Sequence, residues 1–198
     1  MAEVKNRKEK QYVNDKHLLN YTLNDQVVHA MLVSNLAYCV GKELGIDEET
    51  CQALFDAGQV HDIGKKELAT YVYEESTPLM VEEMKYVRMH PMIGYDILKE
   101  RGFSDFIVET VKHHHENMDG TGYPDNLSGE DIPYGARIIR VCDVFGALIA
   151  DRPYRKAFDE DMAVELMIEE IKNFDIKIFL AFQRVVHEGK YKDVVFEK

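Results

Sequence analysis

The sequence has no long apolar run. The chain has 198 residues, and its longest apolar stretch is far shorter than the roughly 20 apolar residues of a membrane-spanning helix. Residues 1–16 are charged and have no apolar core, so they do not resemble a secretory signal. We therefore expect no membrane segment in this chain. Residues 1–19 are interpreted as a charged tail or the remnant of a linker, and residues 20–198 as one domain.

Cysteine is too scarce for a disulfide framework. Cys39, Cys51 and Cys142 are odd in number, lie far apart in the sequence and form no CxxC pair. This pattern is typical of buried thiols in a reducing compartment. The sequence thus predicts a cytoplasmic protein.

Positive charge is also in short supply. Lys and Arg total 24 against 36 Asp and Glu, which gives a formal net charge of −12. An acidic surface repels nucleic-acid backbones and anionic lipids, so we expect neither as a partner. A small anionic substrate must then be attracted locally, by metal ions or by a few arginines.

Alternating polar and apolar runs, typical of strands, are rare. Apolar residues instead recur with a period near 3.6, as at Val28, Leu32 and Val40. Segments with a helical pattern cover residues 25–44, 50–60, 82–100, 106–115, 132–150, 159–173 and 176–187. Residues 119–129 are dense in turn formers and predict a loop. The predicted fold class is all-α.

Histidine carries the strongest functional signal. Adjacent His61 and Asp62 can offer one imidazole nitrogen and one carboxylate oxygen to a shared pair of metal ions. Lys65 lies one turn beyond His61 on the same face, where its ammonium can hold a phosphate oxygen. Taken alone, this motif fits a helix cap with a surface lysine about equally well.

Other candidates are weaker singly than together. Asp25 and His29 share a helical face, although such a pair is more often a surface hydrogen bond. His90 precedes a proline, as capping residues often do. Three consecutive imidazoles at residues 113–115 have no packing rationale. Asp143 lies in an apolar helical pattern, where a carboxylate is costly to bury unless it pairs with an arginine or binds a metal.

Mixed imidazole and carboxylate ligands indicate the class of metal. They favour Mn²⁺, Fe, Ni²⁺ or Zn²⁺ over Mg²⁺ or Ca²⁺, which prefer oxygen ligands alone. The candidates are too many for one ion, so a centre of two or three ions is expected. Ions about 3.5–4 Å apart can activate a bridging hydroxide and clamp the phosphate under attack.

Five sequence blocks stand in a characteristic order: AGQVHDIGK at 57–65, MHPMIG at 89–94, HHENMDGTGYP at 114–124, ARIIRVCD at 136–143 and DRPYR at 151–155. In this order and spacing they resemble the HD-GYP subfamily of the HD phosphohydrolases, over roughly residues 20–185. The resemblance implies an HD-domain helical bundle with additional C-terminal helices. It also implies a bacterial phosphodiesterase that hydrolyses cyclic di-GMP to linear pGpG or onward to GMP, with some relatives acting on cyclic GMP-AMP.

The resemblance also implies roles for particular residues. It assigns metal ligation to His29, His61, Asp62, His90, His114, His115 and Asp143. Asp25 stands where some members place a glutamate that bridges a further metal. Because Asp is one methylene shorter, the number of ions stays open between two and three. Iron or manganese is expected first, with nickel and zinc as alternatives. His113 is expected outside the ligand set.

Substrate contacts follow from the same resemblance. Lys65, Arg152 and Arg155 match positions that contact substrate phosphates, and the planar fork of arginine suits phosphate oxygens. Tyr123, in the Gly-Tyr-Pro loop, is counted with the substrate contacts and not with the catalytic groups. The alternative for this loop is a structural turn with an aromatic plug. The family connects the loop with docking of partners, here a cyclase-type signalling protein.

Two departures from the family pattern stand out. Gly146 occupies a place where the family usually has a second Asp, and the missing carboxylate removes a contact to a Lys or a His near the metals. Residues 66–74, expected at the substrate entrance, lack the proline that is common there.

The mechanism expected from these residues is attack of a metal-activated hydroxide on phosphorus, with Asp62 and Lys65 as catalytic residues. Lys65 neutralises charge on the phosphate, and the two arginines orient the dinucleotide. One rival is an HD-type hydrolase of a nucleotide monophosphate or an alarmone. Another is a non-catalytic receptor or adaptor for a cyclic dinucleotide. A homodimer is a further hypothesis that no sequence feature supports.

Overall fold

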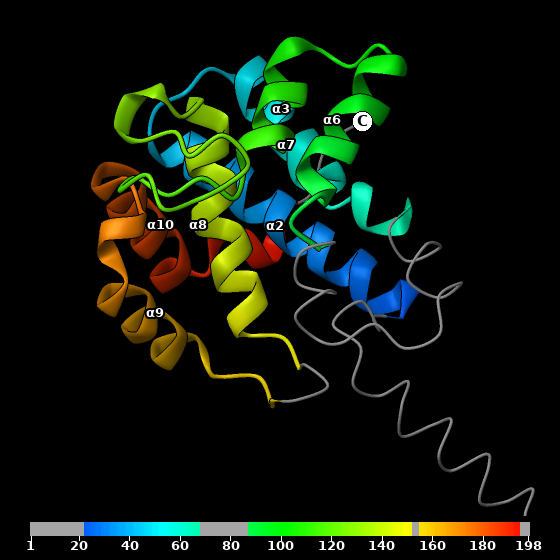
Figure 1. Cartoon of the computed structure of the whole chain (residues 1–198). Helices are drawn as coiled ribbons and strands as arrows, with labels where there is room; N and C mark the ends of the chain where they lie inside the picture. Colours follow the sequence, from blue (N-terminus) through cyan, green and yellow to red (C-terminus); the bar gives the residue numbers. More distant parts are fainter. Residues whose placement is uncertain (1–21, 68–86, 152–154, 195–198) are drawn as a thin grey trace, which may run out of the picture.

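The computed structural model describes residues 22–67, 87–151 and 155–194 (Figure 1). The regular secondary structure of these residues is helical, and no β-strand occurs among them. The α-helices are α2 (Leu23–Glu43), α3 (Glu48–Val60), α6 (His90–Glu100), α7 (Asp105–His113), α8 (Tyr134–Leu148), α9 (Glu160–Glu169) and α10 (Ile176–Glu188). Short 3-10 helices are η1 (Gly129–Asp131), η2 (Ile171–Asn173) and η3 (Lys190–Asp193). The predicted all-α fold class is confirmed.

The predicted helical segments agree with these helices to within a few residues at most ends. One difference is that the segment 159–173 breaks into α9 and η2 at Glu170. Another concerns the segment 82–100: residues 82–86 lie outside the described residues, residues 88–89 form a turn, and α6 begins at His90. Pro91 in the first turn of α6 favours a start there, because proline lacks the N–H that a helix interior needs.

Helix starts follow from local side chains. The Thr22 side chain accepts from the backbone N–H of Asp25, and the Asp25 carboxylate accepts from Thr22, which forms a capping box at α2. Asp47, Ser104 and Asp159 accept backbone N–H groups in the same way at α3, α7 and α9. These caps give the helices defined starts, and so fix where the side chains of their first and last turns point.

The core surrounds α2, which runs through the middle of the molecule (Figure 1). Helices α3, α8 and α10 pack on it, and α7 packs against α3, α6 and α8. On the α10 side, the Phe145 ring meets that of Phe182 edge to face at 5.1 Å. This packing presents the N-terminal half of α2 to the middle of α8.

None of the helices described is long and apolar enough to cross a bilayer. The three cysteines are free, and Cys51 and Cys142 are buried as predicted, while Cys39 is partly exposed.

Candidate metal centre

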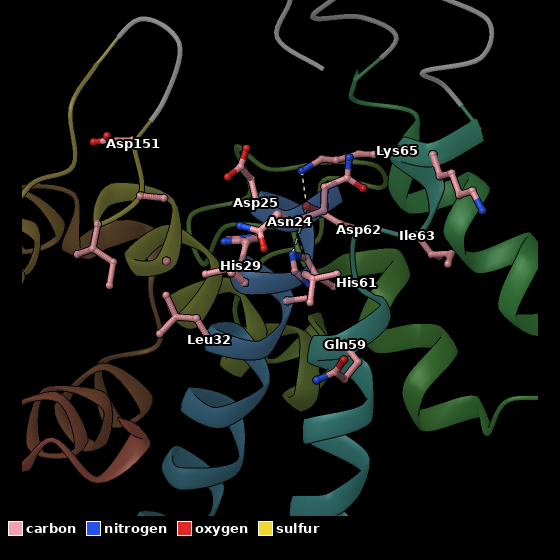
Figure 2. Close-up of a pocket in the computed structure, with 18 residues that line it drawn as sticks. Asn24, Asp25, His29, Leu32, Gln59, His61, Asp62, Ile63, Lys65 and Asp151 are labelled. Atoms are coloured by element: carbon pink, nitrogen blue, oxygen red, sulfur yellow. Dashed lines mark hydrogen bonds and ion pairs between the residues drawn. The ribbon is translucent and has the colours of Figure 1, made fainter. Parts of the chain in front are cut away.

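Ends and faces of five helices converge on one cluster of histidines and aspartates, of which Figure 2 shows His29, His61 and Asp62. His61 caps the C-terminus of α3, Asp62 follows it, and His114 caps the C-terminus of α7. His90 is the first residue of α6. The remaining members are His29 on α2, Asp143 on α8, and His115 just after α7.

The cluster divides into two groups. The four-residue group is Asp62, His90, His114 and His115, and the three-residue group is His29, His61 and Asp143. Within each group, ligand atoms from all members lie within 4.8 Å of one another. The groups adjoin, because Nε2 of His61 lies 3.5 Å from Asp62 Oδ2 and 3.6 Å from Asp143 Oδ1. The structure therefore brings together all seven residues that the resemblance named as ligands.

Backbone carbonyls orient three of the imidazoles. Nδ1 of His61 lies 2.8 Å from the Gly58 carbonyl oxygen, and Nδ1 of His114 lies 2.6 Å from that of Val111. Both acceptors belong to last-turn carbonyls, which have no partner within their helix. Nδ1 of His90 makes the same contact, at 2.6 Å, with the carbonyl three residues earlier. A ring that donates from Nδ1 keeps the lone pair of Nε2 free for a metal ion.

Three buried atoms of the cluster lack ordinary partners. Nδ1 of His29, Nε2 of His61 and Oδ1 of Asp62 make no hydrogen bond within the described part of the chain. Buried polar atoms nearly always have a partner, so three such atoms in one His/Asp cluster fit a site that binds a cation. The donor set therefore suits a metal ion.

The carboxylates of the cluster are held in their ionised form. Burial alone would raise the pKa of Asp62, but Lys65, His61 and His90 outweigh it and hold that pKa well below its usual value. Burial would likewise raise the pKa of Asp143, yet the hydrogen bond from His29 and the nearby His61 ring keep it well below the usual value. Both groups are thus ready to ligate without first losing a proton.

Two histidines of the four-residue group, His114 and His115, are held neutral. Burial and the neighbouring His90 and His61 lower the pKa of His114 well below its ordinary value. Burial and the adjacent His114 do the same to the pKa of His115. By contrast, Asp62 and Asp143 outweigh burial at His61 and raise its pKa. Neutral imidazoles beside ionised carboxylates are the protonation states that metal binding requires.

Gly64 allows α6 to approach the turn that follows α3. A Cβ built on Gly64 would lie 2.1 Å from the His90 carbonyl oxygen and 2.9 Å from the Gly94 nitrogen. Only a residue without a side chain fits there. This close approach places His90 Nε2 3.2 Å from Asp62 Oδ1.

The Gly-Tyr-Pro loop packs on the four-residue group. The Tyr123 ring stacks on His115, with centroids 4.8 Å apart and an interplanar angle of 23°. Gly122 permits this contact, because a Cβ there would lie within 2.5 Å of backbone atoms of residues 115–117. Tyr123 thus lies against a member of the cluster, and it is not among the residues that line the cavity described below.

Asp125 fastens this loop to α7. Its Oδ2 lies 2.7 Å from Lys112 Nζ and 3.1 Å from His113 Nε2, and its backbone N–H donates to Glu116 at 2.7 Å. His113 belongs to neither group of the cluster, in line with its expected place outside the ligand set. The contact between His113 and Asp125 in this loop explains why a histidine stands at position 113 beside the two ligand positions.

Replacing Asp125 by Ala should lower Tm by about 2–4 °C at pH 7. Because the Asp125 side chain is 42% exposed, screening limits its contribution to about 1 kcal/mol. Hydrogen bonds from Lys112 and His113 lower the pKa of Asp125. Its stabilisation is therefore present above the unfolded pKa of about 3.9 and is lost as pH falls through the lower folded-state pKa.

Thermal melts of the two proteins between about pH 3 and pH 7 test this. Asp131→Asn, at an exposed position outside this network, serves as the control. A Tm difference that grows on acidification would contradict the assigned role.

The structure describes two of the three residues that are predicted to contact substrate phosphates. Lys65 Nζ lies 2.6 Å from Asp62 Oδ2, beside the cluster. Arg155 lies elsewhere: its guanidinium donates to the carbonyls of Ala147 and Leu148 at the end of α8, and it stacks over Phe158 at 4.5 Å. Both carbonyls belong to the last turn of α8, where carbonyl oxygens commonly accept from basic side chains. Arg152 lies outside the described residues.

Asp25 lines the cavity but serves α2 as well. Its Oδ2 accepts from the Thr22 hydroxyl at 2.7 Å and the Thr22 N–H at 3.1 Å. Asp25 belongs to neither group of the cluster. Its cap hydrogen bonds occupy Oδ2 of the carboxylate that a third metal would need.

Arg140 is a neighbour of the cluster that the sequence analysis missed. Its Nε donates to Asn117 Oδ1 at 3.0 Å, and its Nη1 lies 3.4 Å from His115 Nδ1. Like Asp143, it is a charged residue inside the apolar pattern of α8, and that signal could have found it.

A cavity of about 680 Å³ opens on the three-residue group. Figure 2 shows Asp62 and Lys65 at one edge, with His29 and His61 beside them and Asp151 farther off. Apolar side chains from α2 and the end of α8, Val28, Leu32 and Ile149 among them, line the remainder. The volume lies in the range of small-molecule sites, about 300–1,000 Å³.

The family model for the HD domain matches residues 8–178. The chain belongs to the HD domain family. The match begins inside residues 1–19, and the predicted boundary between tail and domain stays a prediction.

Relatives of this HD domain include a cyclic di-GMP phosphodiesterase of Pseudomonas aeruginosa, 35% identical over 160 residues, which cover 80% of this chain and 39% of that protein. A 3'3'-cGAMP-specific phosphodiesterase of Vibrio cholerae is 32% identical over 153 residues, 76% of this chain and 36% of that protein. The chain thus spans less than half the length of these relatives.

A solved structure of an HDG"Y"P protein from Bdellovibrio bacteriovorus superposes with a TM-score of 0.66 at 20% identity. The superposition covers 82% of this chain and 52% of the Bdellovibrio protein. This agreement confirms the HD-type helical fold. With the family match and the relatives, it also confirms the HD-GYP resemblance drawn from the sequence blocks.

Proposed function

We propose that this HD domain is a metal-dependent phosphodiesterase that hydrolyses cyclic di-GMP. The observation that carries the proposal is the pair of adjoining His/Asp groups, one of which opens on a cavity edged by Lys65. Seven ligands of mixed imidazole and carboxylate type suit two divalent transition-metal ions, with iron or manganese first and nickel or zinc as alternatives. Two ions are favoured over three because the Asp25 carboxylate already caps α2.

The chain's own residues supply the rest of the mechanism. Divalent ions bound in the two groups contribute Lewis acidity toward a phosphate and lower the pKa of water. Asp62 touches both groups and so fixes their spacing. Lys65, held at Asp62, places an ammonium where charge builds on the non-bridging phosphate oxygens. The apolar part of the cavity, toward Val28 and Leu32, receives the body of the nucleotide and keeps water from it.

The choice of substrate rests on the relatives. One is named for cyclic di-GMP and another for 3'3'-cGAMP, at 35% and 32% identity. Cyclic di-GMP is therefore the first substrate and cyclic GMP-AMP the second, with pGpG or GMP as the product. Arg152, Arg155 and Tyr123 stay predicted substrate contacts. Docking of a cyclase-type protein at the Gly-Tyr-Pro loop and a homodimer stay predictions as well. The three free cysteines support a cytoplasmic location.

The test is hydrolysis of cyclic di-GMP by protein reconstituted with Mn²⁺ or Fe²⁺, with metal counted on the same sample. We expect turnover with about two ions per chain and none after chelation. Cyclic GMP-AMP and a nucleotide monophosphate belong in the same panel. Binding of cyclic di-GMP without turnover would contradict the proposal and favour a receptor or adaptor.

A further inference from the structure

The histidines of the metal centre are not all held alike. His61, His90 and His114 each have Nδ1 on a backbone carbonyl oxygen. His29 differs, since its Nδ1 is buried and has no hydrogen-bond partner within the described ranges. Its ring is therefore oriented through Nε2 alone, which lies 3.0 Å from Asp143 Oδ1.

Gly146 is the residue that faces this nitrogen. A Cβ built on Gly146 would lie 3.2 Å from both Nδ1 and Cε1 of His29, and 3.4 Å from Val33 Cγ2. Gly146 is buried and stands three residues after Asp143, on the same side of α8. The position that could supply an acceptor to His29 thus has no side chain.

Metal binding would change where the His29 proton lies. In the structure as it stands, Nε2 can donate to Asp143. To ligate a metal ion through Nε2, the neutral ring must carry its proton on Nδ1 instead. That N–H would then be buried without an acceptor, which is costly. Loss of such a supporting acceptor typically weakens metal affinity 10- to 100-fold.

We infer that the two metal positions are unequal, and that Gly146 makes the three-residue group the weaker one. The four-residue group has one more ligand, and two of its three histidines are anchored on carbonyls. Its ion therefore binds first. The ion at His29, His61 and Asp143 binds about 10- to 100-fold more weakly. This inference rests on the metal site of the proposed function, though not on its substrate. The two-ion form is then populated only when the concentration of free metal exceeds the dissociation constant of the weaker site. Activity would therefore follow the concentration of free metal.

The experiment is a calorimetric titration of the metal-free protein with Mn²⁺, with free Mn²⁺ followed by electron paramagnetic resonance. The wild type should bind two ions in separate steps. Gly146→Asp places a carboxylate beside Nδ1 of His29 and should tighten the second step by about 10-fold or more, with the first unchanged. Gly146→Ala makes the same Cβ contact without an acceptor and should not tighten it. His29→Ala should remove the second step alone.

Several outcomes would overturn the inference: two equal sites in the wild type, no Mn²⁺ binding, or equal tightening by Gly146→Ala. Thermal melts show whether Gly146→Asp is folded. If it is not, Gly146→Ser, with a smaller acceptor, must produce the tightening. The proposed function fails separately, because two equal sites with hydrolysis of cyclic di-GMP would overturn only the inference. Unequal sites without hydrolysis would overturn only the function.

Discussion

Asp62→Ala is expected to lower kcat for cyclic di-GMP hydrolysis by at least about 1,000-fold. Asp62 is the only carboxylate of the four-residue group, and its Oδ2 also lies 3.5 Å from His61 and 2.6 Å from Lys65. Its removal takes away the negative charge that holds one ion and positions the lysine. An ion contributes several kcal/mol of transition-state stabilisation, and each 1.4 kcal/mol is about tenfold in rate.

Asp62→Asn is the matched control for shape. It keeps the volume of the side chain and replaces the anionic oxygen by an amide, so we expect nearly the same loss of turnover. Circular dichroism and metal counting on both variants should show a folded protein that has lost the ion of the four-residue group. Wild-type turnover in either variant would refute the role assigned to Asp62.

Gly64→Ala is expected to damage both stability and metal binding. The added Cβ would lie 2.1 Å from the His90 carbonyl oxygen, so the N-terminus of α6 must move away from the turn after α3. Overpacking against backbone costs about 3 kcal/mol at the upper end of its usual range, or a fall in Tm of about 6–12 °C for a chain of this size. Since His90 moves with α6, we also expect the affinity for the first Mn²⁺ to fall by at least about 10-fold.

The control for this substitution lies on the same packing surface. A Cβ on Gly94, in α6, would meet the Val111 side chain at 3.1 Å and the Ile63 side chain at 3.4 Å, and side chains can yield where backbone cannot. Gly94→Ala should therefore change Tm by only about 1–3 °C and leave Mn²⁺ affinity intact. If both variants behave alike, the close approach at Gly64 does not position His90.

Much of this architecture could be predicted from the sequence, because its signals are local. The apolar period placed the helices, and short motifs pointed to His61, Asp62 and the histidines at 113–115. The division into two groups could not be predicted in this way. It depends on His29 meeting Asp143 across 114 positions of sequence, through the packing of α2 on α8.

Arg155 shows that a specific motif does not fix the direction of a side chain. Its motif predicts a phosphate contact, and in the structure its guanidinium lies on the carbonyls of Ala147 and Leu148 at the end of α8. A motif specifies which residue is present, whereas the direction of a long side chain depends on the nearest unsatisfied acceptors. For the same reason the sequence could not show which residue lacks a partner at Gly146, because a carboxylate at that position could have contacted either a Lys or a His.

The carbonyl anchors of His61, His90 and His114 have a consequence for mutagenesis. Their acceptors are main-chain oxygens of Gly58, Val87 and Val111, so no side chain encodes the support of these three rings. An alanine scan would pass over Val87 and Val111 without removing any acceptor. Only changes that alter the main chain, such as a proline or an insertion in the last turn of α3 or α7, would release the rings. Variants of that kind would keep all seven ligating residues and still lose metal binding, because the imidazole rings would no longer be oriented.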